Sequence, residues 1–219
     1  MRAREPLPEG LLLDVQRRIE ALYALPAEAP VTDFLISEEQ ATGLPGGRSR
    51  TLVAQDGEMV SVGVVFEAGL GPSLTEADPR VRLSASNLGP FSTLTEEVSH
   101  FLYLLYCARA DRSTTQLELE LQGEVDKYLT AALFLSLQNE GAVSVRLREL
   151  LFQRYHLAEG LSAEQVERYH AASGLANRYC GFLERRYLRR SRLRELAQEA
   201  RGFYRLGQRE KLERIAGVA

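Results

Sequence analysis

The sequence predicts an α+β fold, with a mainly helical body and a small N-terminal β-hairpin or sheet. All eight prolines lie at or before Pro90, so the last 129 residues lack the strongest breaker of helices and central strands. After Pro90, apolar residues recur with a period near 3.6, which indicates amphipathic helices. Before it, the Asp56-Gly57 pair stands between two β-rich runs and is typical of a hairpin turn. The chain is therefore expected to divide near residue 90.

The N-terminal part is expected to combine one helix with several short strands. Leu12, Val15, Ile19 and Leu22 would share one face of an amphipathic helix. The β-rich runs predict a strand over 31–36, a hairpin made of 50–54 and 59–66, and one more short strand over 81–85.

The C-terminal part is expected to be helical throughout. The predicted helices cover 94–109, 115–139, 143–156, 162–188, 190–205 and 208–216. Thr93 with Glu96, and Ser162 with Gln165, have the spacing of a capping box at a helix start. These elements predict three segments, 1–90, 91–189 and 190–219, that pack into one compact unit.

Composition excludes several classes of protein. With 219 residues and 45% hydrophobic content, the chain is long and apolar enough to bury a core. Cys107 and Cys180 lack the spacing of a zinc finger or a disulfide framework, which favours a reducing, cytoplasmic location. No apolar run approaches the roughly 20 residues needed to span a bilayer, so no membrane association is expected. The net charge of −3 indicates no general attraction to nucleic acid.

The most distinctive local pattern is Glu96-Glu97-Val98-Ser99-His100, near the start of a central helix. Helical periodicity places Glu96 and His100 on a face shared with Tyr103 and Cys107, so this face is also expected to pack against protein. Glutamate and histidine three or four residues apart on a helix can bind one metal ion, with a further ligand from a neighbouring element. The next helix offers Glu120 and Glu124 for that role.

This pattern resembles the HExxH motif of zincin metalloproteases, with Glu96 in place of the first histidine. The resemblance implies that Glu97 is the catalytic general base and that His100 is a metal ligand. It also implies that Glu120 or Glu124 completes the ligand set, with Glu96 at the position of the missing histidine. Zinc or iron would be the cofactor, and hydrolysis the reaction.

Two weaker resemblances concern the same helix. Glu97 to His100 and Glu167 to His170 both read ExxH, which resembles ferritin-like di-iron bundles, although the order of ligands along the chain differs. Residues 97–101 and 118–127 also resemble a group of uncharacterised bacterial proteins, which implies no activity.

A purely structural interpretation stays open beside these. Glu96 would complete a capping box, Glu97 would be favoured by the helix dipole, and His100 would be a core histidine with satisfied hydrogen bonds. Glu120 and Glu124 would then form a solvated helix face with Lys127. His156 and His170 are expected at helix ends or on the surface.

The C-terminal region is strongly basic in an otherwise acidic chain. Residues 184–214 contain eleven Arg or Lys against five Glu, and six of the arginines lie within 185–194. Interleaved leucines make this region amphipathic. It is expected to pack on the acidic N-terminal part of its own chain, or to bind a protein partner or a second copy; nucleic acid is the least favoured ligand. A non-enzymatic adaptor is therefore the alternative to a metal-binding, hydrolytic protein.

Overall fold

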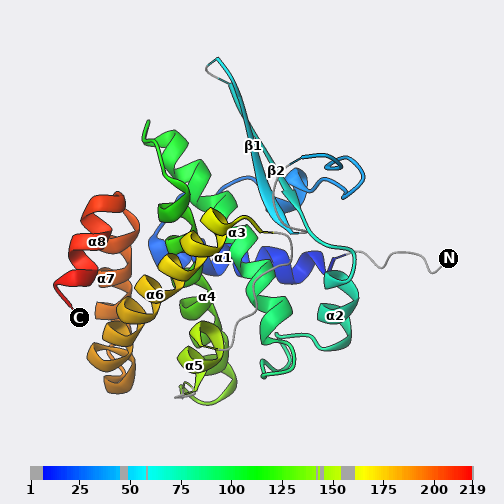
Figure 1. Cartoon of the computed structure of the whole chain (residues 1–219). Helices are drawn as coiled ribbons and strands as arrows, with labels where there is room; N and C mark the ends of the chain where they lie inside the picture. Colours follow the sequence, from blue (N-terminus) through cyan, green and yellow to red (C-terminus); the bar gives the residue numbers. More distant parts are fainter. Residues whose placement is uncertain are drawn as a thin grey trace.

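The structure, a computed structural model, describes residues 7–44, 49–57, 59–141, 143, 146–153 and 161–218. This part of the chain is mainly helical and has one two-stranded antiparallel sheet (Figure 1), which confirms the predicted α+β fold. The helices are α1 (Glu9–Tyr23), α2 (Leu70–Glu76), α3 (Leu88–Arg109), α4 (Gln116–Gln138), α5 (Leu147–Phe152), α6 (Ala163–Arg186), α7 (Leu193–Tyr204) and α8 (Gln208–Ala216). The strands are β1 (Arg50–Asp56) and β2 (Met59–Val65), and the 3-10 helices are η1 (Val31–Phe34) and η2 (Leu188–Arg190).

The predicted hairpin is confirmed. Strands β1 and β2 pair in antiparallel register from Arg50 opposite Val65 to Asp56 opposite Met59. Gly57 in the turn has a φ of 59°, a conformation that glycine adopts at little cost. The inner end of the hairpin packs on the body through the buried Val64, whereas the outer end projects away from it (Figure 1).

The two other predicted strands are wrong. Residues 31–34 form η1 after Pro30, and only Leu35 makes an isolated bridge to Val64. Residues 81–85 form a turn that leads into α3. Their backbone does not pair with a strand. The N–H groups of Val81 and Arg82 donate to the Asp78 carbonyl, Gln138 accepts from the Leu83 N–H, and Asn87 donates to the Arg82 carbonyl.

The helix ends differ from prediction in three places. Helix α3 begins at Leu88, so Pro90 lies in its first turn, where no backbone N–H is required, and Thr93 lies inside the helix instead of capping it. Helix α7 begins at residue 193 because η2 and the left-handed Ser191 interrupt the chain. In the described part of the predicted helix 143–156, α5 spans only Leu147–Phe152, and residues 144, 145 and 154–156 lie outside the described residues. The capping box of Ser162 and Gln165 is confirmed.

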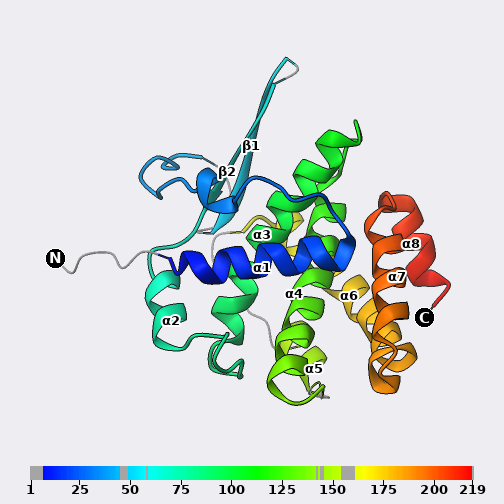
Figure 2. The same ribbon diagram turned by 180° about the vertical axis from the view of Figure 1, so that it is seen from behind.

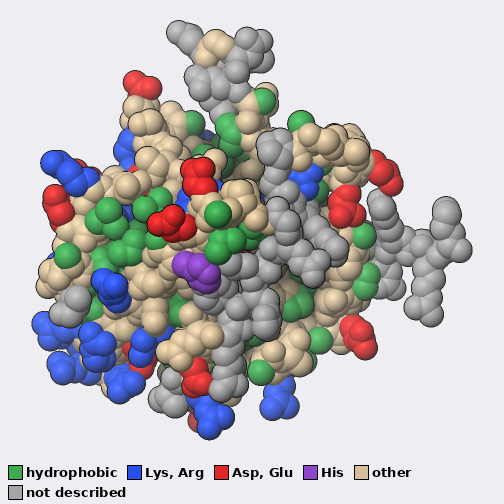
Figure 3. Space-filling view, viewed as in Figure 1, with side chains coloured by type: hydrophobic (Ala, Val, Ile, Leu, Met, Phe, Trp, Pro, Cys, Tyr) green, Lys and Arg blue, Asp and Glu red, His purple; other side chains and the backbone are tan. Residues whose placement is uncertain are grey.

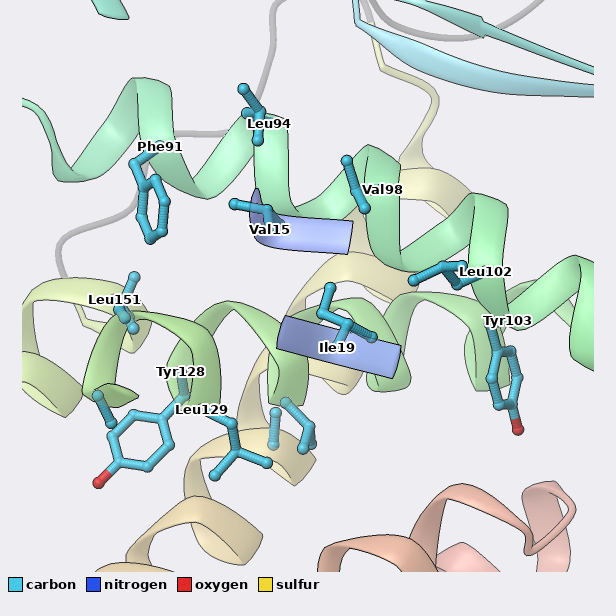
Figure 4. Packing of buried hydrophobic residues seen from close by; sticks show 14 of the residues in the cluster. Val15, Ile19, Phe91, Leu94, Val98, Leu102, Tyr103, Tyr128, Leu129 and Leu151 are labelled. Atoms are coloured by element: carbon cyan, nitrogen blue, oxygen red, sulfur yellow. The ribbon is translucent and has the colours of Figure 1, made fainter. Parts of the chain in front are cut away.

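Helices α3 and α4 form an antiparallel pair at the centre of the molecule. Helix α6 packs on α4, and α1 runs across α3 and α4 to reach α7 (Figure 2). Side chains of α1 such as Val15 and Ile19 fill the space beside Val98 and Leu102 of α3 (Figure 4). Residues from 1–90, 91–189 and 190–219 all belong to this one hydrophobic cluster. None of the helices in the described ranges has the length and hydropathy needed to span a bilayer.

The C-terminal helix α8 is attached to this pair through a buried lysine. Lys211 is fully buried, and its Nζ donates to the Tyr103 hydroxyl of α3 at 2.8 Å and to Gln122 Oε1 of α4 at 2.7 Å. Burial lowers the pKa of Lys211 to about 7, even though the carboxylates of Glu118 and Asp126 oppose that shift.

The lowered pKa of Lys211 makes stability depend on pH. Because the unfolded chain binds this proton up to pH 10.5 and the folded chain only up to about 7, raising the pH above 7 favours the folded state. Between pH 7 and 9, we expect the free energy of unfolding of the wild type, measured with urea, to increase by about 2 kcal/mol more than that of Lys211→Met. Other titrating groups are common to both proteins and cancel in this comparison. An equal pH dependence in both would contradict the assignment.

Candidate metal centre

A cluster of side chains that could ligate a metal ion lies where α3 packs on α4. Glu96 and His100 lie one turn apart on α3, and Glu120 comes from α4. One potential ligand atom from each of these residues lies within 4.8 Å of the other two. Among the described residues, this is the group of three His, Cys, Asp or Glu side chains that meets this distance. His100 Nε2 and Glu120 Oε2 are 3.7 Å apart.

Two atoms of this cluster are buried without a hydrogen-bond partner. They are His100 Nε2 and Glu120 Oε2, on side chains from residues that are 7% and 8% exposed. A buried polar atom without a partner destabilises a fold, which is why such atoms are rare in proteins and often indicate a bound ion or a functional group. Both atoms point to the same place between the two helices.

Gly123 allows the imidazole to lie against α4. A Cβ atom at this position would lie 2.8 Å from His100 Nε2 and 3.5 Å from Glu96 Cγ. A Cβ atom does not approach another non-bonded heavy atom within 3.0 Å, so any side chain at residue 123 would force the His100 ring to move. The absence of a side chain at Gly123 therefore keeps Nε2 beside Glu120.

The other ring nitrogen of His100 faces a different carboxylate. Glu97 Oε2 lies 3.8 Å from His100 Nδ1 and accepts a hydrogen bond of 2.8 Å from the Thr51 hydroxyl of β1. Thr51 also donates to the Glu97 carbonyl, at 3.3 Å. A carboxylate beside one nitrogen of a histidine orients the ring and leaves the other nitrogen for a ligand. Glu97 is thus hydrogen-bonded to the hairpin and lies beside the cluster of Glu96, His100 and Glu120, not within it.

A buried lysine neutralises part of the cluster. Lys127 Nζ lies 3.0 Å from Glu96 Oε2 and 2.9 Å from Glu124 Oε1. The Lys127 and Glu124 side chains are only 12% and 7% exposed, so the solvated helix face that the structural interpretation expected here is wrong. Glu124 is engaged by Lys127 and is not in the group of three.

Carboxylates outnumber cations in this region. Burial lowers the pKa of His100, but the close approach of Glu97 and the charges of Glu120, Glu97 and Glu96 outweigh burial and raise the pKa to about 9. Burial, with the nearby charges of Glu96 and Glu97, raises the pKa of Glu120 to about 7 against the attraction of His100 and Lys127. The cluster therefore has a surplus of negative charge that a cation would compensate.

Of the predicted site residues, the structure brings together Glu96, His100 and Glu120. Glu118, which precedes Glu120 on α4, accepts hydrogen bonds from the Tyr103 hydroxyl and the Arg112 guanidinium and lies outside the cluster. The second ExxH pair, Glu167 and His170, is exposed on α6, as expected for His170. His156 lies outside the described residues. Cys107 and Cys180 are free and buried.

Sequence reasoning did not identify Thr51, Gly123 and Lys127 as parts of this region. A signal existed for Gly123, because glycine inside a helix costs about 1 kcal/mol relative to alanine and so suggests a close approach. For Lys127, the sequence predicted only a place on a solvated helix face with Glu120 and Glu124. Thr51 is 46 residues away from Glu97, and nothing in its local sequence indicates the contact.

No protein family model, curated protein or solved structure matches the chain.

The close packing at Gly123 predicts an unusually costly alanine substitution. Gly123→Ala should lower the free energy of unfolding by about 1–3 kcal/mol, because the added methyl group overlaps the His100 ring. Gly174→Ala is the matched control: this glycine is exposed inside α6, and a methyl group added there would meet open space, so the change should be neutral or stabilise by up to about 1 kcal/mol. Urea unfolding of both variants measures the difference, and similar values would contradict the assigned contact.

Proposed function

We propose that the protein binds one divalent transition-metal ion between α3 and α4, with Glu96, His100 and Glu120 as ligands. The supporting observation is that two buried atoms without a hydrogen-bond partner, His100 Nε2 and Glu120 Oε2, come from different helices and lie 3.7 Å apart, within ion-pair distance but too far for a hydrogen bond. Glu96 adds a carboxylate oxygen beside them. Binding would draw all three donors to about 2.0–2.2 Å from a common point.

The donor set indicates the class of ion. Imidazole nitrogen suits zinc, iron and related metals, whereas carboxylate oxygen also suits manganese. One nitrogen and two oxygens therefore fit Zn²⁺, Fe²⁺ or Mn²⁺ better than Ca²⁺ or Mg²⁺, which prefer oxygen alone.

Hydrolysis is the further part of the proposal. Three protein ligands leave a coordination position for water, and a divalent metal lowers the pKa of such a water toward neutrality. The zincin resemblance would make Glu97 the general base. Its hydrogen bond from Thr51 and its place beside Nδ1 favour a different role, in which Glu97 orients His100.

Elemental analysis tests the metal proposal. Protein purified without a metal-affinity step should contain Zn, Fe or Mn at close to one ion per chain, and His100→Gln or Glu120→Gln should reduce the content at least tenfold. The matched control is the exposed pair on α6, since Glu167→Gln with His170→Gln should leave the content unchanged. Wild-type protein that holds no metal, even after dialysis against each of the three ions, would refute the proposal.

A second candidate function rests on the arginines where α6 ends and α7 begins. Arg185, Arg186, Arg190 and Arg194 are exposed there, and we name them the arginine corner. Lys and Arg side chains gather on this side of the molecule, at the lower left of Figure 3. Most apolar residues of α7 are buried in the protein's own core, with Leu193 at its start exposed, so a partner would be bound mainly through charge. An acidic protein surface, including that of a second copy, fits this chemistry.

Charge removal tests the second candidate. Replacing all four residues of the arginine corner by glutamine should shift a self-association equilibrium toward monomer, with the largest effect at low salt, where charges are least screened. Light scattering after size-exclusion chromatography measures the mass at low and at high salt. Arg17→Gln with Arg209→Gln, two exposed arginines outside the arginine corner, is the control. A wild type that is monomeric in both conditions would contradict self-association.

A further inference from the structure

We infer that Lys127 occupies a second cation position beside the proposed metal site and thereby restricts that site to a single ion. This inference rests on the proposed function, because it concerns the number of ions that the same cluster binds. Its basis is the geometry of Lys127 between two carboxylates of different helices.

The Lys127 ammonium group lies between two carboxylates, as a bound metal ion would. Lys127 Nζ contacts Glu96 Oε2 of α3 at 3.0 Å and Glu124 Oε1 of α4 at 2.9 Å, and its side chain is only 12% exposed. Long charged side chains are rarely buried unless they are paired in this way. Its two carboxylate partners are themselves largely buried, so together they form a built cation position and not a surface ion pair.

Glu96 connects the two positions. Its carboxylate belongs to the converging group with His100 and Glu120, and it also accepts from Lys127. A carboxylate shared between two cations is the usual link in sites with two metal ions, where the ions lie about 3.5–4 Å apart. In this protein one of the two cations is an ammonium that the chain itself supplies.

Charge explains why the lysine would control the number of ions. The cluster contains the carboxylates of Glu96 and Glu120, those of Glu97 and Glu124 lie beside it, and the Lys127 ammonium lies against one side of it. If a neutral side chain replaced Lys127, the buried carboxylates of Glu96 and Glu124 would lose the ammonium group that both of them contact. Such a pair is strongly unfavourable, and a second divalent ion would relieve it.

The test is the number of ions bound by three variants. Isothermal titration with Mn²⁺ and with Zn²⁺, followed by elemental analysis after gel filtration, should give one ion per chain for the wild type and two for Lys127→Met. Adding Glu124→Gln to Lys127→Met removes a ligand of the second position and should return the number to one. Glu124→Gln alone should also bind one ion, because Glu124 is not a ligand of the first.

Each outcome has a distinct meaning. Two ions in the wild type, or one in a folded Lys127→Met, would overturn the role of Lys127 and leave the proposed metal site standing. No ion in the wild type would refute the proposed function itself. Circular dichroism establishes that each variant is folded. If Lys127→Met does not fold, Lys127→Gln serves in its place, and the wild-type stoichiometry still decides between one ion and two.

Discussion

The close packing of α3 on α4 is the contact on which the rest of the structure depends, and it is unusual in how many polar groups it buries. Gly123 lets the His100 ring lie against the backbone of α4, and Asp126, one turn further along, accepts from the Ser99 hydroxyl of α3 at 2.5 Å. Buried polar groups stabilise a fold only when each has a partner. The two helices therefore fit in one register, since sliding either by a turn would separate these donors from their acceptors.

The same interface shows what sequence could predict. Spacing on one helix placed Glu96 and His100 together, and the short connection between α3 and α4 brought Glu120 opposite them. Local patterns also predicted the hairpin, because Asp56-Gly57 has strong conformational preferences of its own. They failed for residues 31–36 and 81–85, where β-branched and alternating residues suggested strands. There the long-range contact of Gln138, the local contact of Asn87 and the proline before η1 determined the backbone instead.

The contacts between elements far apart in sequence could not be read from the chain. Thr51 approaches Glu97 only because the hairpin folds back over α3, and Lys211 reaches Tyr103 and Gln122 only because α8 packs across the end of the pair. In the basic region, composition alone suggested a surface that binds partners. The structure divides it in two: the apolar residues Leu196, Ala200 and Phe203 belong to the core, and the arginine corner remains outside.

The hydrogen bond from Thr51 links the position of the projecting hairpin to the proposed metal site. Thr51 belongs to β1, and Glu97 lies between it and His100. A molecule that bound the hairpin and displaced Thr51 would therefore alter how firmly His100 is oriented, and so the affinity for an ion. Thermodynamic linkage then requires the converse, because the ion must change the affinity of the hairpin for that molecule by the same factor. The position of the hairpin and the orientation of His100 are therefore coupled through Thr51 and Glu97.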